Sequence, residues 1–483
     1  MVTPIVWDKT MELMTPSEAA QIHEATLTVL GKTGIKMPLK PDRLEKAQDL
    51  GLKYDKSKDR VYFTADVVEK ALKSAPAEYT LYSRNPENDL VIDSKHGYLT
   101  SDGSATRIMD IDTGEIRNSV TKDLENLGIV TDYMPQISFL WPSIAASDKT
   151  ERIQSLYELR ALFMNTSKHI QAMTAVDSLN ARGTVEIARS VVGGAEALRK
   201  KPVISNFQCG ISPLTYHDEA LEAAFIFAEA GVPTGFMNMQ IGCATAPATL
   251  AGNLVLGNAE VLAGIVLLEL LYPGTPTFYG ACSTTMELTQ GGINAGCPED
   301  VQLQALNTQM SHFYKVPANI GTFASSAKTI DWETGVRNAA SCAASMLAKA
   351  DMMCGAGLFC CASVFALEQM VLDCENFEFV QRMLRGIKID EETLALDVID
   401  AVGPGGHYMT QDHTVRHLRD PWQAKIMHRG SYEDWIHKGK KGPAEKANEM
   451  VKKILATHKP VIHQDASNVD EIIAEYERYA AEE

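Results

Sequence analysis

The chain has 483 residues, of which 62 are acidic and 45 basic, so its formal net charge is −17. This balance argues against a protein that wraps nucleic acid or docks on an anionic membrane, because both need a basic face. The length allows a large core that needs no staples, and the nine cysteines have no framework spacing. They are therefore predicted to be free thiols in a reducing cytoplasm.

Two segments of the sequence indicate where in the cell the protein is expected. Residues 1–8 contain no basic stretch followed by an apolar core, so no secretory signal is expected there. The most apolar stretch, residues 253–272, contains Asn258, Glu260 and Glu269. These polar groups favour a buried helix over a membrane span. We therefore expect a cytoplasmic protein that is not held in a membrane.

Apolar runs of β type alternate with helical patterns through the middle of the chain. After an early run at residues 98–101, with a continuation at 106–111, they begin near Ile137, Lys168, Val203, Pro233, Thr275, Ala318 and Asp351. The seven later starts are 30 to 43 residues apart, which is the length of one βα unit. Eight such units predict a TIM (β/α)8 barrel. A doubly wound sheet is the competing fold, but the sequence has no phosphate-loop fingerprint to favour it.

Helix signals agree with this count. Thr215 is a candidate N-cap for a helix that has Asp218 and Glu219 in its first turn and ends at Gly231. Pro298 opens another helix with acids in its first turn, as the helix dipole favours.

The predicted division of the chain has three parts. Residues 1–95 form a helical and hairpin extension, residues 96–430 the barrel, and residues 431–483 a helical tail packed on the barrel. Both flanking parts are of the kind that forms an oligomer interface or a lid, so a homo-oligomer is expected.

In a TIM barrel the chemistry lies at the carboxyl ends of the strands. Here those ends carry amides, aromatics, methionines and glycines, with almost no acids or histidines. A metal-dependent hydrolase would show acids and histidines there. A single aromatic residue is more often a packed wall, but several on one rim favour a cage for a soft cation.

The histidines near the end of the predicted barrel suggest a loop more than a metal centre. His407 follows the glycine-rich residues 403–406, which let a backbone approach something bulky. His413 and His417 are four residues apart and share a face if their segment is helical. That spacing can bind zinc, but the glutamate of a zinc-protease helix is missing. No metal is assigned, and a role in ordering the loop is expected.

Four segments resemble one known family. They are residues 109–117 (MDIDTGEIR), 367–373 (LEQMVLD), 403–414 (GPGGHYMTQDHT) and 428–435 (HRGSYEDW). They resemble the trimethylamine methyltransferase family, and the resemblance extends over nearly the whole chain. The glycine–histidine segment is the most specific. The resemblance implies a TIM-type barrel and methyl transfer from an amine to the cobalt of a separate corrinoid protein.

One difference from the founding family members indicates which class of substrate to expect. The founding trimethylamine enzymes carry pyrrolysine on a loop that aligns near residues 323–328, and here that segment reads FASSAK, all standard residues. Members without pyrrolysine resemble demethylases of quaternary amines such as glycine betaine, proline betaine, carnitine or γ-butyrobetaine. A quaternary ammonium is already an activated methyl donor, because its leaving group departs as a neutral amine.

The sequence therefore predicts a quaternary amine:corrinoid-protein methyltransferase, with no tightly bound cofactor and with cobalamin presented by a partner protein. The alternatives are a betaine-binding scaffold without turnover and a trimethylamine demethylase that lacks pyrrolysine. No catalytic residue is assigned. Aromatic rings are expected to form a cage for the ammonium group, amides to orient the substrate, and the histidine after the glycines to join the site. The predicted substrate-binding residues are Trp141, Phe207, Tyr279, Phe323 and Phe359 (rings), Asn206, Asn238 and Gln240 (amides), and His407.

Overall fold

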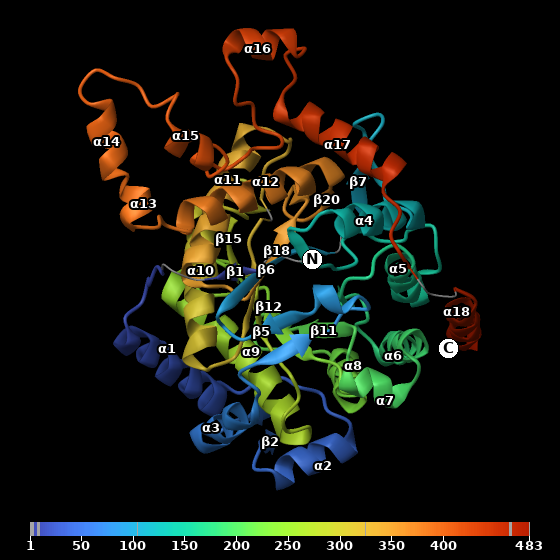
Figure 1. The fold of residues 1–483 in the computed structure, drawn as a ribbon. Coiled ribbons are helices and arrows are strands. Elements are labelled where there is room, and N and C mark those ends of the chain that lie inside the picture. The colour runs from blue at the N-terminus through green and yellow to red at the C-terminus, as the bar shows by residue number, and fades with distance from the viewer. Residues whose placement is uncertain (1–3, 7–9, 104, 324, 463–465, 483) are drawn as a thin grey trace.

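The computed structural model describes residues 4–6, 10–103, 105–323, 325–462 and 466–482. Its centre is a barrel of parallel strands, and each of the eight predicted strands is present (Figure 1). They are β6 (His96–Ser101), β9 (Ile137–Phe139), β10 (Ile170–Gln171), β11 (Ile204–Cys209), β12 (Thr234–Asn238), β14 (Tyr279–Ala281), β17 (Ala318–Gly321) and β18 (Met352–Ala356).

The strands close on themselves in chain order. The hydrogen-bonded path runs β6-β18-β17-β14-β12-β11-β10, and β9 pairs with the other edge of β6. An isolated parallel bridge between Leu140 and Ile170 joins β9 to β10 and completes the ring. The predicted TIM barrel is therefore confirmed.

Helices separate successive strands and surround the barrel, as this fold requires. They are α4 (Thr121–Tyr133), α5 (Gln154–Phe163), α6 (Ser178–Val192), α7 (Ala195–Lys200), α8 (Asp218–Ala230), α9 (Leu250–Leu271), α10 (Pro298–Phe313), α11 (Trp332–Ala348) and α12 (Leu367–Leu384). Helix α9 is long and apolar enough to cross a membrane, but 89% of its most apolar window is buried inside the protein. It is a core helix.

The helix boundaries confirm part of the sequence analysis. Pro298 is the first residue of α10, and Gly231 ends α8 with a left-handed φ of 78°. The predicted N-cap of α8 was wrong: α8 begins after His217, whose side chain makes no capping bond. Thr215 instead exchanges backbone hydrogen bonds with Ile211 in the preceding turn, so it is too far from the helix to cap it.

The N-terminal part packs outside the barrel and closes one of its ends. It contains α1 (Pro16–Thr28), the π-helical turn η1 (Val29–Thr33), α2 (Pro41–Asp49), α3 (Ala65–Ser74) and the hairpins β2–β3 (Lys53–Asp55, Arg60–Tyr62) and β4–β5 (Tyr79–Leu81, Leu90–Ile92). Leu81, Leu90 and Ile92 of the second hairpin pack in one cluster with Tyr98 and Phe139 from inside the barrel. This hairpin plugs the amino-terminal end of the barrel.

Two small sheets follow the carboxyl ends of the strands. One contains β13 (Ile241–Gly242), β15 (Thr284–Glu287) and β16 (Gly292–Ile293). The other has the order β19 (Leu358–Phe359), β20 (Val364–Phe365), β7 (Arg107–Met109), β8 (Ile116–Asn118). The predicted continuation of the first barrel strand through residues 106–111 was therefore wrong, because β7 pairs with β8 and β20 in this separate sheet.

Residues 386–437, which we call the arm, project from the body beyond α12 (Figure 1). The arm contains α13 (Glu391–Leu394), α14 (Leu396–Val402), α15 (Asp412–His417) and α16 (Tyr432–His437), and Ile426 is its one buried residue. The chain then returns to the body through α17 (Pro443–Thr457), which packs on α4 and α12, and α18 (Ser467–Glu482), which packs on α5 and α6. The division at residues 95 and 430 stays a prediction.

Candidate active site at the barrel mouth

Side chains that point into the barrel at the carboxyl ends of its strands form the floor of the open end. We call them the mouth cluster: Asp102, Trp141, Met173, Phe207, Cys209, Met237, Cys282 and Cys354. They come from seven different strands or the residues just after them. Because the hairpin β4–β5 plugs the opposite end, this end is the candidate entrance for a ligand.

The aromatic part of the mouth cluster is a pair of rings. Trp141 and Phe207 lie with their centroids 4.9 Å apart and their planes tilted by 51°. Phe207 also meets Phe278 edge-on, with centroids 6.3 Å apart, one layer deeper in the lumen. The buried Trp141 Nε1 has no hydrogen-bond partner among the described residues. This pair offers one apolar wall and one unused donor.

The rest of the wall is rich in sulfur. The Cys209 Sγ lies 3.8 Å from the Met239 Sδ, and the Cys282 Sγ lies 3.6 Å from the Met237 Sδ. Burial raises the pKa of the Cys209 thiol to about 12, so this thiol stays protonated at neutral pH. The Cys209 sulfur therefore acts as neutral, polarizable surface and not as a thiolate nucleophile or metal ligand.

Asp102 is the acidic member of the mouth cluster. Asp102 is 6% exposed, and its Oδ1 accepts a hydrogen bond of 2.9 Å from the Gly103 backbone N–H. Burial raises the pKa of this carboxyl to about 7, and the Gly103 hydrogen bond opposes that shift. A Cβ on Gly103 would lie 3.1 Å from the Met173 Sδ and 3.1 Å from the Pro142 carbonyl oxygen, so the turn after Asp102 is tightly packed.

A pocket of about 770 Å³ adjoins the mouth cluster at Met173 and extends between the amino-terminal ends of α5 and α6. Glu158 lines it, and burial raises the pKa of this carboxyl. Arg152 and Asp177 form an ion pair of 3.0 Å on its wall. The space beside the mouth is ample for a small organic molecule.

The three predicted amides do not reach the mouth. Asn206 donates to the Ala172 carbonyl oxygen, Asn238 accepts from the Ser283 hydroxyl, and Gln240 donates to the Asn253 carbonyl oxygen on α9. Successive side chains of a strand alternate between faces, so Asn206 and Phe207 cannot both point inward. The prediction that these amides line the site was therefore wrong in geometry: they lie on the outward face of the barrel.

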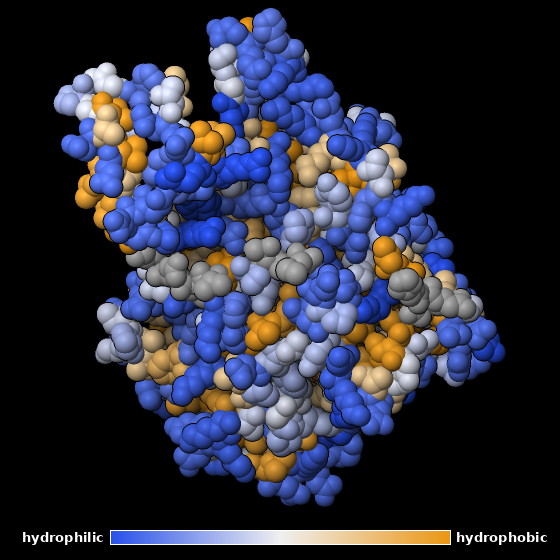
Figure 2. Space-filling model, viewed as in Figure 1, coloured by the Kyte–Doolittle hydropathy of each residue, from blue (hydrophilic) through white to orange (hydrophobic). Residues whose placement is uncertain are grey.

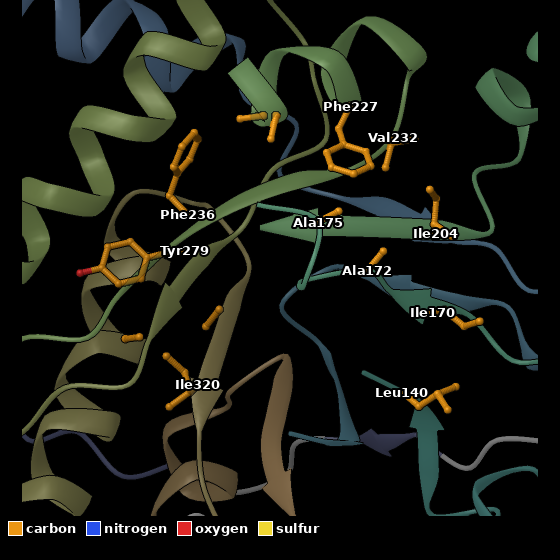
Figure 3. Packing of buried hydrophobic residues seen from close by; sticks show 14 of the residues in the cluster. Leu140, Ile170, Ala172, Ala175, Ile204, Phe227, Val232, Phe236, Tyr279 and Ile320 are labelled. Atoms are coloured by element: carbon orange, nitrogen blue, oxygen red, sulfur yellow. The ribbon is translucent and has the colours of Figure 1, made fainter. Parts of the chain in front are cut away.

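The five predicted rings do not converge either. Trp141 and Phe207 lie in the lumen, whereas Tyr279 and Phe323 belong to the core between strands and helices. Figure 3 shows Tyr279 and Phe236 directed outward, and the Tyr279 hydroxyl donates to the Asn307 Oδ1 on α10 at 3.1 Å. Phe359 packs with Val364 in the small sheet above. The five-ring cage was wrong, and two of its members remain together.

His407 is exposed on the arm, where His417 forms ion pairs with Glu392 and Asp420. His413 and His417 share a face of α15 as predicted, with ring centroids 4.4 Å apart, and their ligand atoms and that of Glu392 all lie within 4.8 Å. The Glu392 carboxylate, however, accepts from Arg416 at 2.9 Å. Hydrogen bonds to Asp420 and Glu392 raise the pKa of His417, which favours an imidazolium that joins α13 to α15.

Comparison with known proteins decides the family. The family model for trimethylamine methyltransferase (MTTB) matches residues 3–481. The chain belongs to this family. Two similar relatives come from Desulfitobacterium hafniense. One is the glycine betaine methyltransferase of strain Y51, 32% identical over 451 residues and covering 93% of both chains. The other is the trimethylamine methyltransferase MttB of strain DSM 10664 / DCB-2, 31% identical over 462 residues, or 95% of this chain and 93% of the relative.

A solved structure supports the fold of this family member. The monomethylamine methyltransferase of Methanosarcina barkeri superposes with a TM-score of 0.52 over 97% of this chain and 92% of that chain, at 11% identity. Sequence reasoning missed Asp102, Met173, Met237 and the thiols Cys209 and Cys282 of the mouth cluster. Their inward position follows from the alternation of side chains along each strand, but both faces are buried, so the sequence alone did not show which face is inward.

Proposed function

We propose that the protein is a corrinoid-dependent methyltransferase that takes a methyl group from a quaternary amine. The mouth cluster carries the proposal: two aromatic rings, sulfur atoms and one carboxyl surround the open end of a barrel in a member of this family. Such a wall suits a group that is cationic and has no proton to donate, because ring faces and sulfur attract it without hydrogen bonds.

The residues of the mouth position the substrate and do little chemistry themselves. A quaternary ammonium needs no general acid, since the nitrogen leaves as a neutral tertiary amine. Trp141 and Phe207 would hold the methylated nitrogen, and the buried lumen below them would keep water away from the reacting carbon. This account explains why no acid–base pair is needed near the mouth.

The methyl acceptor is proposed to be the cobalt of a corrinoid carried by a separate protein. When present at the mouth, this group supplies a nucleophile strong enough to displace an amine. In Figure 1 the arm and α16 project on the side of the small sheets that follow the carboxyl ends of the strands. They would flank a partner that approaches the mouth from that side, which agrees with a corrinoid that is presented and not tightly bound.

Glycine betaine is the first substrate to test, because the relative of that name is 32% identical and the segment at residues 323–328 holds only standard residues. Proline betaine, carnitine and γ-butyrobetaine remain in the same proposed class. The nine free cysteines agree with the proposed cytoplasmic location. A homo-oligomer also remains a proposal, and the apolar residues exposed on the arm are a candidate surface for it (Figure 2).

The test uses the purified protein with cobalamin reduced to Co(I), and absorbance reports methyl transfer from each of the four quaternary amines and from trimethylamine. We expect transfer from at least one quaternary amine and none from trimethylamine. Tyr279→Phe serves as a matched control that should keep this activity, because its ring faces α10. Calorimetric binding of a betaine without any transfer would instead support a binding subunit, and transfer from trimethylamine alone would support a demethylase of that amine.

A further inference from the structure

Asp102 is the one carboxyl of the mouth cluster, and it lies where the substrate would sit. It follows β6 directly, and its charge acts on Cys209 at the end of β11 and on Cys354 of β18, so its carboxyl faces the lumen. The turn that carries it packs against Met173 and Trp141. The carboxyl is thus held at the ring pair by the backbone and not by a flexible loop.

No cation compensates this carboxyl within the described part of the chain. There it accepts from the Gly103 N–H, its charge acts on the buried thiols of Cys209 and Cys354, and no lysine, arginine or histidine acts on it. A buried carboxylate without a partner is unfavourable, and it becomes favourable when a positive charge is buried beside it.

We propose that Asp102 is the counter-ion of the substrate's quaternary ammonium group and selects cationic over neutral substrates at the mouth. This inference rests on the proposed function and names the residue that recognises the charge. A trimethylammonium group cannot accept a hydrogen bond from a protonated carboxyl, so it binds the ionised form. Trp141 and Phe207 supply the apolar contact, and Asp102 supplies the charge.

The charge pairing changes during the reaction. The methyl carbon forms its new bond with an electron pair from the acceptor, and the pair of the broken C–N bond stays on nitrogen, which becomes a neutral amine. Asp102 then has no cation beside it and takes up a proton from water as the product leaves; binding of the next substrate releases that proton. Because the attraction is strongest before the methyl moves, Asp102 should lower KM without raising kcat.

The first experiment compares two ligands of the same shape. Glycine betaine and 3,3-dimethylbutyrate differ only in having nitrogen or carbon at the branched centre, so only the first is cationic there. We expect Asp102→Asn to weaken glycine betaine binding 10- to 100-fold by calorimetry and to leave 3,3-dimethylbutyrate binding unchanged. In turnover with reduced cobalamin, KM should rise by the same factor while kcat stays within about threefold.

Asp300→Asn is the matched control. Asp300 is also buried with its pKa raised to about 7, but it lies in the first turn of α10, where it accepts from Gln304 at 3.2 Å. Its substitution should leave the affinity for both ligands unchanged. Equal affinity of wild type and Asp102→Asn for glycine betaine would overturn the counter-ion role while the proposed function stands. Absence of binding and transfer with every quaternary amine in the wild type would instead overturn the proposed function.

A second measurement needs no variant. Glycine betaine binding to the wild-type protein, followed by calorimetry at pH 6 in buffers of different ionisation enthalpy, should release close to one proton, and the affinity should rise with pH up to about 8. Tetramethylammonium should do the same, whereas 3,3-dimethylbutyrate should not. Binding of both cations without proton release and with no pH dependence would contradict the pairing even if Asp102→Asn fails to fold.

Discussion

The two faces of the same barrel strands differ in what they hold. At the mouth the inward face carries rings, thioethers, thiols and a single carboxyl, with Trp141 and Phe207 4.9 Å apart, and within the lumen Asn319 donates to Gln171 across the barrel. The outward face carries amides and a tyrosine that bond to neighbouring loops and helices, as Asn238 does to Ser283 and Tyr279 to Asn307, although the Asn238 Nδ2 has no partner among the described residues. We therefore expect the outward side chains to serve stability and the inward side chains at the mouth to serve binding.

The largest effect is expected on the outward face at Asn307. This buried amide accepts from the Tyr279 hydroxyl and donates to the Ser283 hydroxyl at 3.1 Å and to the Leu303 carbonyl oxygen at 2.8 Å. Asn307→Ala leaves these groups unpaired, so the free energy of unfolding should fall by about 2–4 kcal/mol in urea titrations. KM for the quaternary amine should stay within about twofold.

The exposed Gln302 on the same helix is the control, and Gln302→Ala should change stability by less than about 0.5 kcal/mol. A tenfold rise of KM in Asn307→Ala, with the protein folded, would show that the outward network also shapes the site.

A smaller effect is expected on the inward face at Trp141. Trp141→Leu removes the larger ring of the pair, so KM should rise about tenfold, which is about 1.4 kcal/mol, with kcat within about threefold. Tyr279→Leu and Phe359→Leu, which the sequence alone would place in the cage, should leave KM unchanged. If Tyr279→Leu raises KM and Trp141→Leu does not, the two faces have been assigned the wrong way round.

The third effect concerns pH and the acids buried behind the strands. Burial raises the pKa of Glu260, Glu269, Asp300 and Asp373 to about 7 in the folded protein, compared with about 4 when unfolded. Below pH 4 both states hold these protons. Between pH 4 and 7 the unfolded state releases them first, so the stability they contribute is lost as pH rises through 7.

The thermal midpoint should therefore be several degrees higher at pH 5.5 than at pH 8. Asp373→Asn removes one such group while keeping a polar side chain beside Asn338 and Gln369, so it should reduce the slope of the midpoint against pH. A midpoint that rises between pH 5.5 and 8 would mean that these carboxyls are ionised in the folded state.

The smallest effect is expected for the sulfur atoms. Met237→Leu keeps the volume of an inward side chain and removes its thioether, so KM and stability should change little, by less than about 1.5 kcal/mol in the free energy of unfolding. Calorimetry and denaturant titration measure both. A large loss of affinity here would mean that sulfur contributes more than an apolar wall.

The sequence predicted the barrel because βα units have a regular length, and Gly231 and Pro298 mark helix ends by their own backbone preferences. It did not predict which side chains line the site. The strands of a parallel barrel are buried on both faces, so alternation of polar and apolar residues, which would show the inward side, is absent. Asn206, Phe207 and Gln208 illustrate this, since all three are buried and only their order around the strand separates them.

The position of the arm's two ends has a consequence for how this chain tolerates change. The arm leaves after α12 at Leu384 and comes back to the same helix before it continues to α16: the Glu375 carboxylate accepts from the backbone N–H groups of Lys425, Ile426 and Met427, and Lys425 pairs with Glu378. The segment is thus a closed insertion whose base is fastened to one helix. Closing such a loop costs little more when it lengthens. The length of the loop between Leu384 and Lys425 can therefore change at little cost to the stability of the barrel beneath it.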